Sequence, residues 1–301
     1  MRISTSYSFQ MNIAAMQEKQ ANLSHTQQQL ATQRRILTPS DDPTGAAHAL
    51  QVSQSLAASE SYAANIKAAT IRLNGESNVL EAVRKVLDNV RNIANSASGT
   101  SDMEKRAHYA TYLQQTYQDL LGYANTTDTD GNYMFAGFKG GTVPFQQVSG
   151  AANYQGDAGQ RSVAISNGRQ IEVSDAGQTV FGVGSADDPF AVIDQFITDL
   201  QNPGLTGSAY DTAVNTALTS ISNARSTVVG VHNQVATRLQ ELQEAETVQA
   251  NFTLQFKNEL DRVESVDMQE AAVKLQLQQV SLQATQQAFV NASQLFLFNY
   301  L

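Results

Sequence analysis

Residues 268–301 read MQEAAVKLQLQQVSLQATQQAFVNASQLFLFNYL. Apolar side chains recur at every seventh position of this stretch, at Met268, Leu275, Leu282, Phe289 and Phe296. Such a spacing is typical of a helix that buries one narrow seam against another helix. The other end of the chain repeats the pattern, at Phe9, Met16, Leu23, Leu30 and Leu37. We therefore predict a helical seam at each end of the chain.

Both terminal stretches carry few charges. Residues 3–33 contain only Glu18 and Lys19, and residues 271–301 contain only Lys274. A helix on the surface of a monomer normally has charged side chains on its outer face. We therefore interpret the ten seam residues as an assembly interface. The alternative is an intramolecular coiled coil of the two ends.

The bulk composition excludes several classes of protein. A chain of 301 residues has room for two or three domains. Its net charge of −9 repels phosphate and argues against nucleic-acid binding. No apolar run is long enough to cross a bilayer, and the start lacks a cleavable secretory signal, which leaves export by an uncleaved signal open. Cysteine is absent, so disulfides and thiolate metal sites are excluded.

Glycine and proline divide the chain into three parts. Of 18 glycines, 11 lie between Gly131 and Gly184, and no proline occurs in residues 44–143 or 204–301. Long proline-free stretches with helical periodicity predict long helices. Ser40-Asp41-Asp42-Pro43 has the composition of a helix start. We predict helices over about 44–72, 76–95, 102–123 and 224–298, with a short one over 189–200.

Residues 142–186 have a different pattern. Three short stretches alternate like strands, at 163–165, 171–173 and 179–181, with Asn167-Gly168 and Ala176-Gly177 turns between them. We expect these strands to close a small core of their own. The predicted fold is mainly α with a β-rich insertion: an elongated rod built on a long antiparallel helical bundle, with the terminal helices forming an intermolecular coiled coil.

The periodicity also predicts domains and a core. We expect a terminal polymerisation domain (1–40 and 265–301), a rod domain (41–141 and 205–264) and an outer β-rich domain (142–204). The apolar stripes of the rod helices predict one shared core, formed by Val79, Val83, Leu87, Val90, Leu242, Phe252, Phe256 and Val263.

No catalytic, cofactor or metal site emerges from the sequence. The four histidines are far apart and show no metal-ligand spacing. Phe138-Lys139-Gly140-Gly141 lacks the order of a phosphate loop. Aligning Asp128-Thr129-Asp130-Gly131 to a calcium loop leaves two strong ligands missing, so we interpret it as a turn.

Several segments resemble the flagellin superfamily, and in particular its hook–filament junction proteins. The resemblance covers nearly the whole chain and is weakest at residues 142–223. It is carried by Met1-Arg2-Ile3-Ser4-Thr5, Pro39-Ser40-Asp41-Asp42-Pro43-Thr44-Gly45-Ala46, Ala124-Asn125-Thr126-Thr127, Gly131-Asn132-Tyr133-Met134-Phe135-Ala136-Gly137, Tyr154-Gln155-Gly156-Asp157 and Leu295-Phe296-Leu297-Phe298-Asn299-Tyr300-Leu301.

The resemblance implies a structural, non-enzymatic subunit of an extracellular bacterial flagellum. Members of the superfamily build a tube whose inner layer is a coiled coil of terminal helices. The implied partners are further copies of the chain, hook-associated protein 1 on the hook side, flagellin, an export chaperone and the type III export apparatus. Export is implied to use an uncleaved N-terminal region.

Two other functions stay open from the sequence. The chain is a flagellin in the first alternative, which a high copy number along the whole filament would favour. In the second, the β-rich insertion is a secreted enzyme or a sugar-binding module. Sugar binding calls for an exposed aromatic cluster, for which the insertion offers only Tyr154 and Phe181.

Overall fold

The computed structural model describes residues 2–148 and 151–298, and the chain forms two compact units. The terminal unit comprises Met1–Ala58 and Asn251–Leu301, and the central unit comprises Ser59–Ala250. Two long helices, α2 (Pro43–Ala97) and α6 (Gly207–Glu264), contribute residues to both units.

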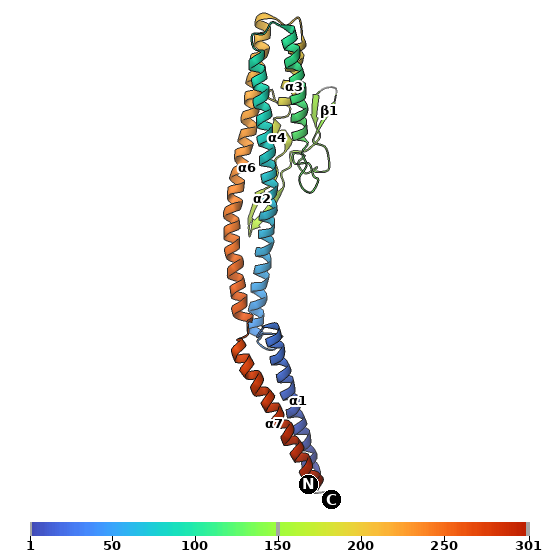
Figure 1. Cartoon of the computed structure of the whole chain (residues 1–301), viewed down its shortest axis with the longest axis vertical. Coiled ribbons are helices and arrows are strands. Elements are labelled where there is room, and N and C mark those ends of the chain that lie inside the picture. The colour runs from blue at the N-terminus through green and yellow to red at the C-terminus, as the bar shows by residue number, and fades with distance from the viewer. Residues whose placement is uncertain (1, 149–150, 299–301) are drawn as a thin grey trace. The chain divides into compact units, whose positions relative to one another are not determined.

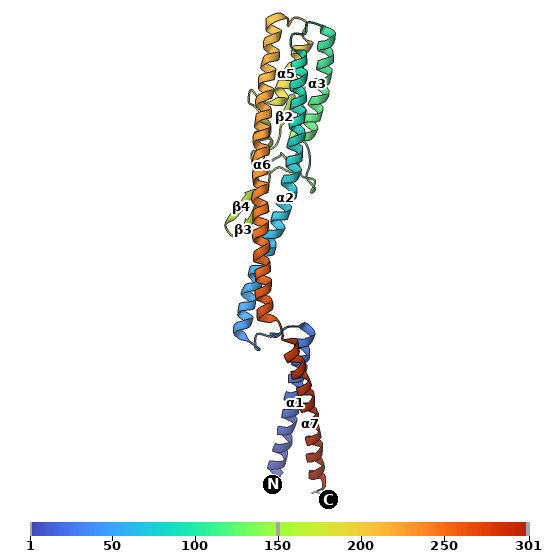
Figure 2. The same cartoon turned by 60° about the vertical axis from the view of Figure 1, so that its left-hand side comes forward.

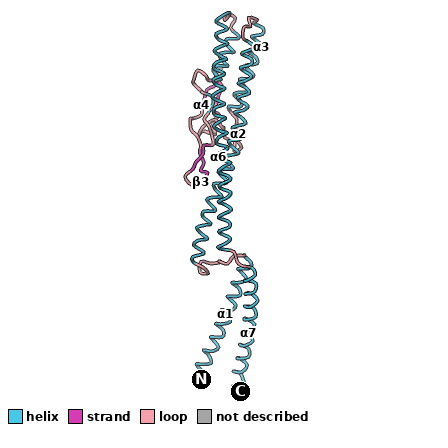
Figure 3. The backbone as a smooth tube through the Cα atoms, turned by 90° about the vertical axis from the view of Figure 1, so that its left-hand side faces the viewer, coloured by secondary structure: helices cyan, strands magenta, loops and turns pink. Residues whose placement is uncertain are grey.

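The terminal unit contains a pair of helices from the two ends of the chain. Helix α1 (Arg2–Thr32) and helix α7 (Met268–Phe298) pack against each other. They run antiparallel, so that both chain ends lie together, as Figures 1 and 2 show. The unit also contains the first turns of α2 and the last turns of α6, which loops connect to the pair (Figure 3).

The central unit is built around the remaining turns of α2 and α6. Helices α3 (Met103–Ala124) and α5 (Pro189–Gln201) lie beside them. Two antiparallel hairpins and a short helix fill the connection between α3 and α5. They are β1 (Phe145–Val148) with β2 (Ala151–Tyr154), β3 (Ser162–Ser166) with β4 (Arg169–Glu172), and α4 (Gly177–Phe181).

A seven-residue repeat forms the seam of the central unit. Ten residues at this spacing on α2 and α6 are at most 1% exposed: Ile66, Leu73, Leu80, Leu87, Ala94, Val214, Ile221, Val228, Val235 and Leu242. The repeat then reaches Ser59 on α2 and Gln249 on α6, which are both buried. The Gln249 amide donates to the Ser59 hydroxyl (2.7 Å) and carbonyl (3.1 Å). A polar pair in an apolar seam stabilises one register over the others.

Several predicted helix ends are confirmed by their caps. Asp102 accepts backbone N–H bonds at the start of α3, and Asp188 does so at the start of α5, with Pro189 in the first turn. Helix α2 begins at Pro43, where the Asp42 carboxylate accepts the N–H of Gly45 (2.9 Å). Each cap satisfies a donor that the first helical turn leaves free.

Four predicted helix boundaries are wrong. The break expected between residues 72 and 76 is absent: α2 continues through Gly75, where an added Cβ would lie 3.1 Å from Met134 Cε. The single helix expected over 224–298 begins earlier, at Gly207, ends at Glu264 and restarts at Met268. The first seam also stops early: α1 ends at Thr32, so Leu37 lies in a loop.

The β-rich insertion is partly as predicted. The hairpin over 162–172 is confirmed, whereas residues 177–181 form helix α4 and not a strand. The hairpin of β1 and β2, with Phe145 opposite Tyr154, was not predicted. Phe145, Ile165 and Ile171 belong to the same buried cluster as the helices. The expectation of a separate small core is therefore wrong.

The residues expected in the rod core fall into two groups. Val83, Leu87, Val90 and Leu242 are buried, and Val79 packs against their cluster. The other three lie in the terminal unit: Phe252 is 46% exposed, and Phe256 and Val263 are half-buried. Their placement in that core is wrong, because α3, α5 and the hairpins, which cover the seam, all belong to the central unit.

Candidate assembly surface

Nine of the ten predicted seam residues lie along the pair of α1 and α7, and Leu37 lies in the loop after α1. The rings of Phe9 and Phe289 are 5.1 Å apart. Most of the other seam residues are half-buried: Met16, Leu23, Leu30, Leu37, Leu275 and Leu282. Phe9 and Met268 are 44% and 47% exposed, and the side chain of Phe296 lies outside the described residues. The seam thus supports pairing of the two ends within one chain and leaves apolar surface uncovered.

Helix α7 has a second apolar face. Val273, Leu277 and Val280 are 66%, 70% and 64% exposed. Positions 273 and 277 each lie two residues from Leu275, about 200° around the helix axis at 3.6 residues per turn. This outer stripe, defined as Val273, Leu277 and Val280, is therefore on the side of α7 opposite the seam.

Exposed apolar residues concentrate in the terminal unit. Seventeen large apolar side chains are exposed in the described part of the chain, and eleven of these belong to the terminal unit. The eleven are Tyr7, Phe9, Met11, Leu50, Phe252, Leu254, Met268, Val273, Leu277, Val280 and Val290. Exposed apolar side chains gathered in one part of a chain indicate an interaction site. The helix pair itself carries few charges: Arg2, Glu18 and Lys19 on α1, and Glu270 and Lys274 on α7.

A joint closes the other end of the helix pair. The two chain segments form a short antiparallel bridge there, between Arg34 and Ser265. Arg35 N donates to Glu264 O (2.6 Å), and Val266 N donates to Gln33 O (3.1 Å). These bonds satisfy backbone groups at the point where both helices end.

Side chains reinforce the joint. The Arg35 guanidinium donates to the Val263 carbonyl (3.0 Å) and to the Asp42 carboxylate (3.1 Å). The Asp41 carboxylate accepts the N–H groups of Leu37 and Thr38 (2.9 and 2.8 Å). The N–H of Thr38 is the main cause that lowers the pKa of Asp41 below its usual value. The quoted motif of residues 39–46 therefore has a physical role as the turn and helix cap of this joint.

Gly45 is the glycine of that motif. A Cβ on Gly45 would lie 2.4 Å from Asp42 Oδ2 and 2.7 Å from Ile36 Cδ1. A side chain at this position would therefore have to displace the Asp42 carboxylate and the end of Ile36, which favours glycine here.

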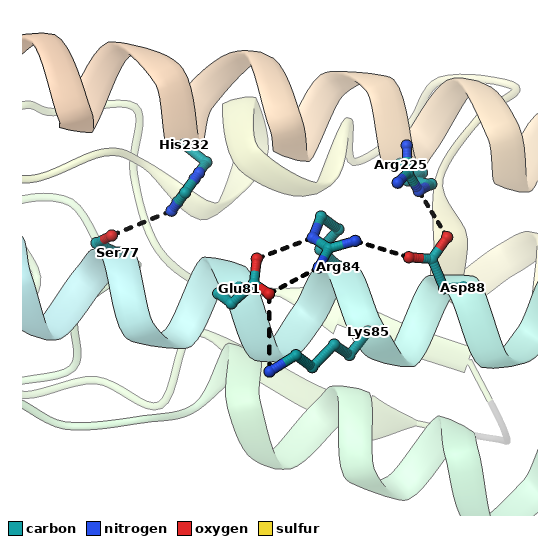
Figure 4. A network of polar contacts seen from close by, with 7 residues as sticks. All are labelled: Ser77, Glu81, Arg84, Lys85, Asp88, Arg225 and His232. Carbon is teal, nitrogen blue, oxygen red and sulfur yellow. Dashed lines mark hydrogen bonds and ion pairs between the residues drawn. The ribbon is translucent and has the colours of Figure 1, made fainter.

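In the central unit, polar bonds link α2 to α6 beside the seam. Arg225 Nε donates to Asp88 (2.7 Å), and the Ser77 hydroxyl lies 3.1 Å from His232 Nε2 (Figure 4). Each bond joins residues more than 130 positions apart in sequence. They therefore fix the register of the two helices.

One ionic chain runs along α2 itself. Arg84 donates to Glu81 (2.7 and 2.8 Å) and to Asp88 (2.9 Å), so it connects to the Arg225 contact (Figure 4). The hydrogen bond from Arg84 is the main cause that lowers the pKa of Glu81 to about 2. Both carboxylates form ion pairs with Arg84, so their role is structural and not acid–base catalysis.

In the described part of the chain, no three potential ligands converge on a metal position. A groove of about 840 Å³ lies in the central unit, where Arg72 and Asp128 in its wall pair with each other. Asp128 also accepts the N–H groups of Asp130 and Asn132, as a turn residue does. Among the described helices, none is both long and apolar enough to span a bilayer.

The two aromatic residues considered for sugar binding are not available as a platform. Phe181 is buried. The Tyr154 hydroxyl donates to the carbonyls of Phe135 (2.9 Å) and Asp157 (2.8 Å), which holds the half-buried ring in the central unit. Both residues serve packing.

Comparison with known proteins gives a consistent result. Residues 3–139 match the bacterial flagellin N-terminal helical region. The chain is 29% identical over 315 residues to flagellar hook-associated protein 3 of Escherichia coli K12, with 99% of both chains covered. The chain is similar to flagellar hook-associated protein 3 along its full length. The protein of that name from Salmonella typhimurium LT2 is 28% identical over 318 residues, again with 99% of both covered.

A solved structure agrees in fold. Hook-associated protein 3 from Legionella pneumophila superposes with a TM-score of 0.64 at 19% identity, over 71% of this chain and 98% of that one. The similarity to hook-associated protein 3 thus extends from sequence to the helical architecture with its small β region.

Three features of the structure were not predicted from the sequence. The cap at Asp267, which accepts the N–H groups of Gln269 and Glu270 (2.9 and 3.1 Å), had a signal, because Asp-x-x-Glu is a capping pattern. The Ser59–Gln249 pair had one too, since both fall on the seven-residue repeat. The outer stripe of α7 was missed because its residues alternate in sequence with those of the stronger seam pattern.

Proposed function

We propose that this chain is a structural subunit of the bacterial flagellum that forms the junction layer between the hook-side junction protein and the flagellin filament. Full-length similarity to two curated proteins named hook-associated protein 3 supports this role over that of flagellin. The observation that carries it in the structure is the exposed apolar surface of the α1–α7 pair, which carries few charges.

The assembly interface combines two faces of the helix pair. The seam residues from Phe9 to Leu30 on α1 and from Met268 to Phe289 on α7 hold the two helices together and contribute their exposed parts to neighbouring copies, and Leu37 and Phe296 complete the proposed interface. The outer stripe of α7 faces a neighbouring subunit. Burying one such Val or Leu side chain contributes about 1.5–3 kcal/mol, which corresponds to roughly 100 Å² of apolar surface.

The outer stripe is small, which suits a contact that forms only within an assembled layer. Three side chains supply roughly 300 Å² per copy, well below the ~800 Å² per partner of a stable interface. Single chains therefore stay apart in dilute solution, and the contact becomes stable where many copies meet in a layer.

The remaining partners and the domain roles belong to the same proposal. The chain contacts hook-associated protein 1 on the hook side and flagellin on the filament side. It leaves the cell through the type III export apparatus, with an export chaperone and an uncleaved N-terminal region, and acts outside the cell without enzymatic activity. Its polymerisation domain is 1–40 with 265–301, its rod domain is 41–141 with 205–264, and residues 142–204 form the outer domain.

Removing the chain tests the proposed role. A strain that lacks it should carry hooks without filaments and release flagellin monomers into the medium. Electron microscopy and immunoblots of the medium measure both effects. Normal filaments on such a strain would overturn the proposal, and a high copy number of the chain along each filament would favour flagellin instead.

A second experiment tests the surface. Val273→Asp with Leu277→Asp places two carboxylates on the outer stripe, where burial of each costs several kcal/mol. The control, Gln279→Asp with Gln283→Asp, adds the same charge to exposed polar positions of α7 outside the stripe. The stripe variant should appear in the medium together with flagellin, while the control supports filaments. Equal filament growth on both would exclude the stripe from the interface.

A further inference from the structure

A buried ionic cluster ties the segment after β4 to both long helices of the central unit. Arg238 on α6 donates to Asp175 (2.8 and 3.2 Å) and to Glu172 (2.9 Å). Asp175 is 2% exposed and also accepts the amide of Gln160 (2.9 Å). The segment of residues 172–175 is therefore anchored to α6 by a pair of charges with little access to water.

The same segment is anchored to α2. Arg72 Nε donates to the Val173 carbonyl (2.8 Å), and the guanidinium pairs with Asp128. One turn further along α2, Glu76 is 2% exposed. The carboxyl of Asp175 is close enough to raise the pKa of Glu76, and the buried Oε1 of Glu76 has no hydrogen-bond partner.

The charges around Glu76 do not balance if it is ionised. Two cations, Arg72 and Arg238, face the carboxyls of Asp128, Glu172 and Asp175 before Glu76 is counted. Each cation already has a carboxylate partner of its own. A buried carboxylate without a cation is strongly disfavoured. A hydrogen bond between two carboxyl groups also requires a proton on one of them.

We propose that a protonated Glu76 donates to Asp175, that this hydrogen bond latches residues 172–175 to α2 and α6, and that the latch weakens as the pH rises. The segment carries the end of the β3–β4 hairpin and leads into α4, so opening the latch releases this hairpin region from the helices. The core residues of the helical seam stay in place.

The direction of the pH effect follows from linkage. Burial, and next the charge of Asp175, raise the pKa of Glu76 to about 8, against the opposing effect of Arg238 and Arg72. The pKa of an accessible Glu is 4.5. The contribution of the proton to the closed state is therefore fully present below about pH 4.5, decreases as the pH rises, and is lost above about 8.

Hydrogen exchange of the intact chain measures the latch directly. One proton released on opening makes the opening constant rise up to tenfold per pH unit. After correction for the intrinsic exchange rate, protection of peptides within residues 160–176 should fall about tenfold per unit between pH 5.5 and 7.5, and level off above about 8. Peptides from the seam of α2 and α6 should not follow this slope.

Two substitutions make the test specific. Glu76→Gln keeps a hydrogen-bond donor to Asp175 and cannot ionise, so its protection should stay high and independent of pH. Glu81→Gln removes a carboxylate from the same helix outside the cluster and should keep the wild-type slope. A wild-type profile without slope, or an unchanged slope in Glu76→Gln, would overturn the proposal. The wild-type profile decides alone if Glu76→Gln does not fold.

Discussion

Truncating Leu87 and Phe252 to alanine should give clearly different losses of stability, although the sequence pattern assigned both to one core. Leu87 is fully buried in the seam of the central unit, whereas Phe252 is 46% exposed in the terminal unit. A buried Leu→Ala substitution costs about 3–5 kcal/mol, since a cavity remains. Phe252→Ala removes a half-covered ring and leaves no closed cavity, so we expect about 1–2 kcal/mol.

Urea unfolding followed by circular dichroism at 222 nm gives both values. Leu87→Ala should lower the midpoint of the main transition with an unchanged slope. Leu254→Ala is the matched control for Leu87→Ala, because Leu254 is 60% exposed on α6. Equal losses for Leu87→Ala and Phe252→Ala would show that the two residues share one core after all, and would refute the assignment to two units.

Further predictions concern the joint and the helix pair. Gly45→Ala should destabilise the chain by about 1–3 kcal/mol, because its Cβ would meet the Asp42 carboxylate at 2.4 Å. Gly230→Ala, where an added Cβ has no atom within 4 Å, should instead raise the stability by up to ~1 kcal/mol. Equal shifts of the melting temperature in the two variants would contradict this. Asp267→Ala removes the cap of α7 and should cost about 1 kcal/mol in thermal unfolding. Phe289→Asp should separate α1 from α7, seen as faster proteolysis of both ends, and should prevent filament growth; intact filaments would argue against it. The pKa of Asp42 is lowered mainly by the hydrogen bond from the N–H of Gly45. The ionised carboxylate therefore contributes to stability above about pH 3.8, and this contribution is lost as the pH falls through the lowered pKa of the folded state. Because Asp42→Asn cannot titrate, it should lose less stability than the wild type on acidification.

Local patterns predicted the elements whose formation depends on nearby residues. Proline-free periodic stretches predicted the long helices, and the expected starts at Asp102 and at Asp42-Pro43 are correct. The missed break after Glu264 is different. Residues 265–267 leave the helix because Val266 and Ser265 pair with backbone groups of residues 33–34, which lie far away in sequence.

The short segments of the insertion depended on tertiary contacts. Residues 177–181 alternate like a strand, yet Gly177 N donates to the Phe135 carbonyl and Phe181 packs on Phe145, which together favour a helical turn. Glu76 shows the same limit more strongly. Its neighbours Asp175 and Arg238 come from distant parts of the chain, so no window of the sequence indicates that a carboxyl on α2 is buried.

The joint of the terminal unit has a consequence for the order of folding. Arg35 contacts the Val263 carbonyl across 228 residues of sequence. Closing a loop of that length costs chain entropy before its contacts can form, so structures with such long sequence separations between contacting residues fold slowly. A chain that emerges N-terminus first can complete the central unit as soon as residues 59–250 are free. The terminal unit must wait for the last helix, so the surface proposed for assembly is formed only when the whole chain has arrived.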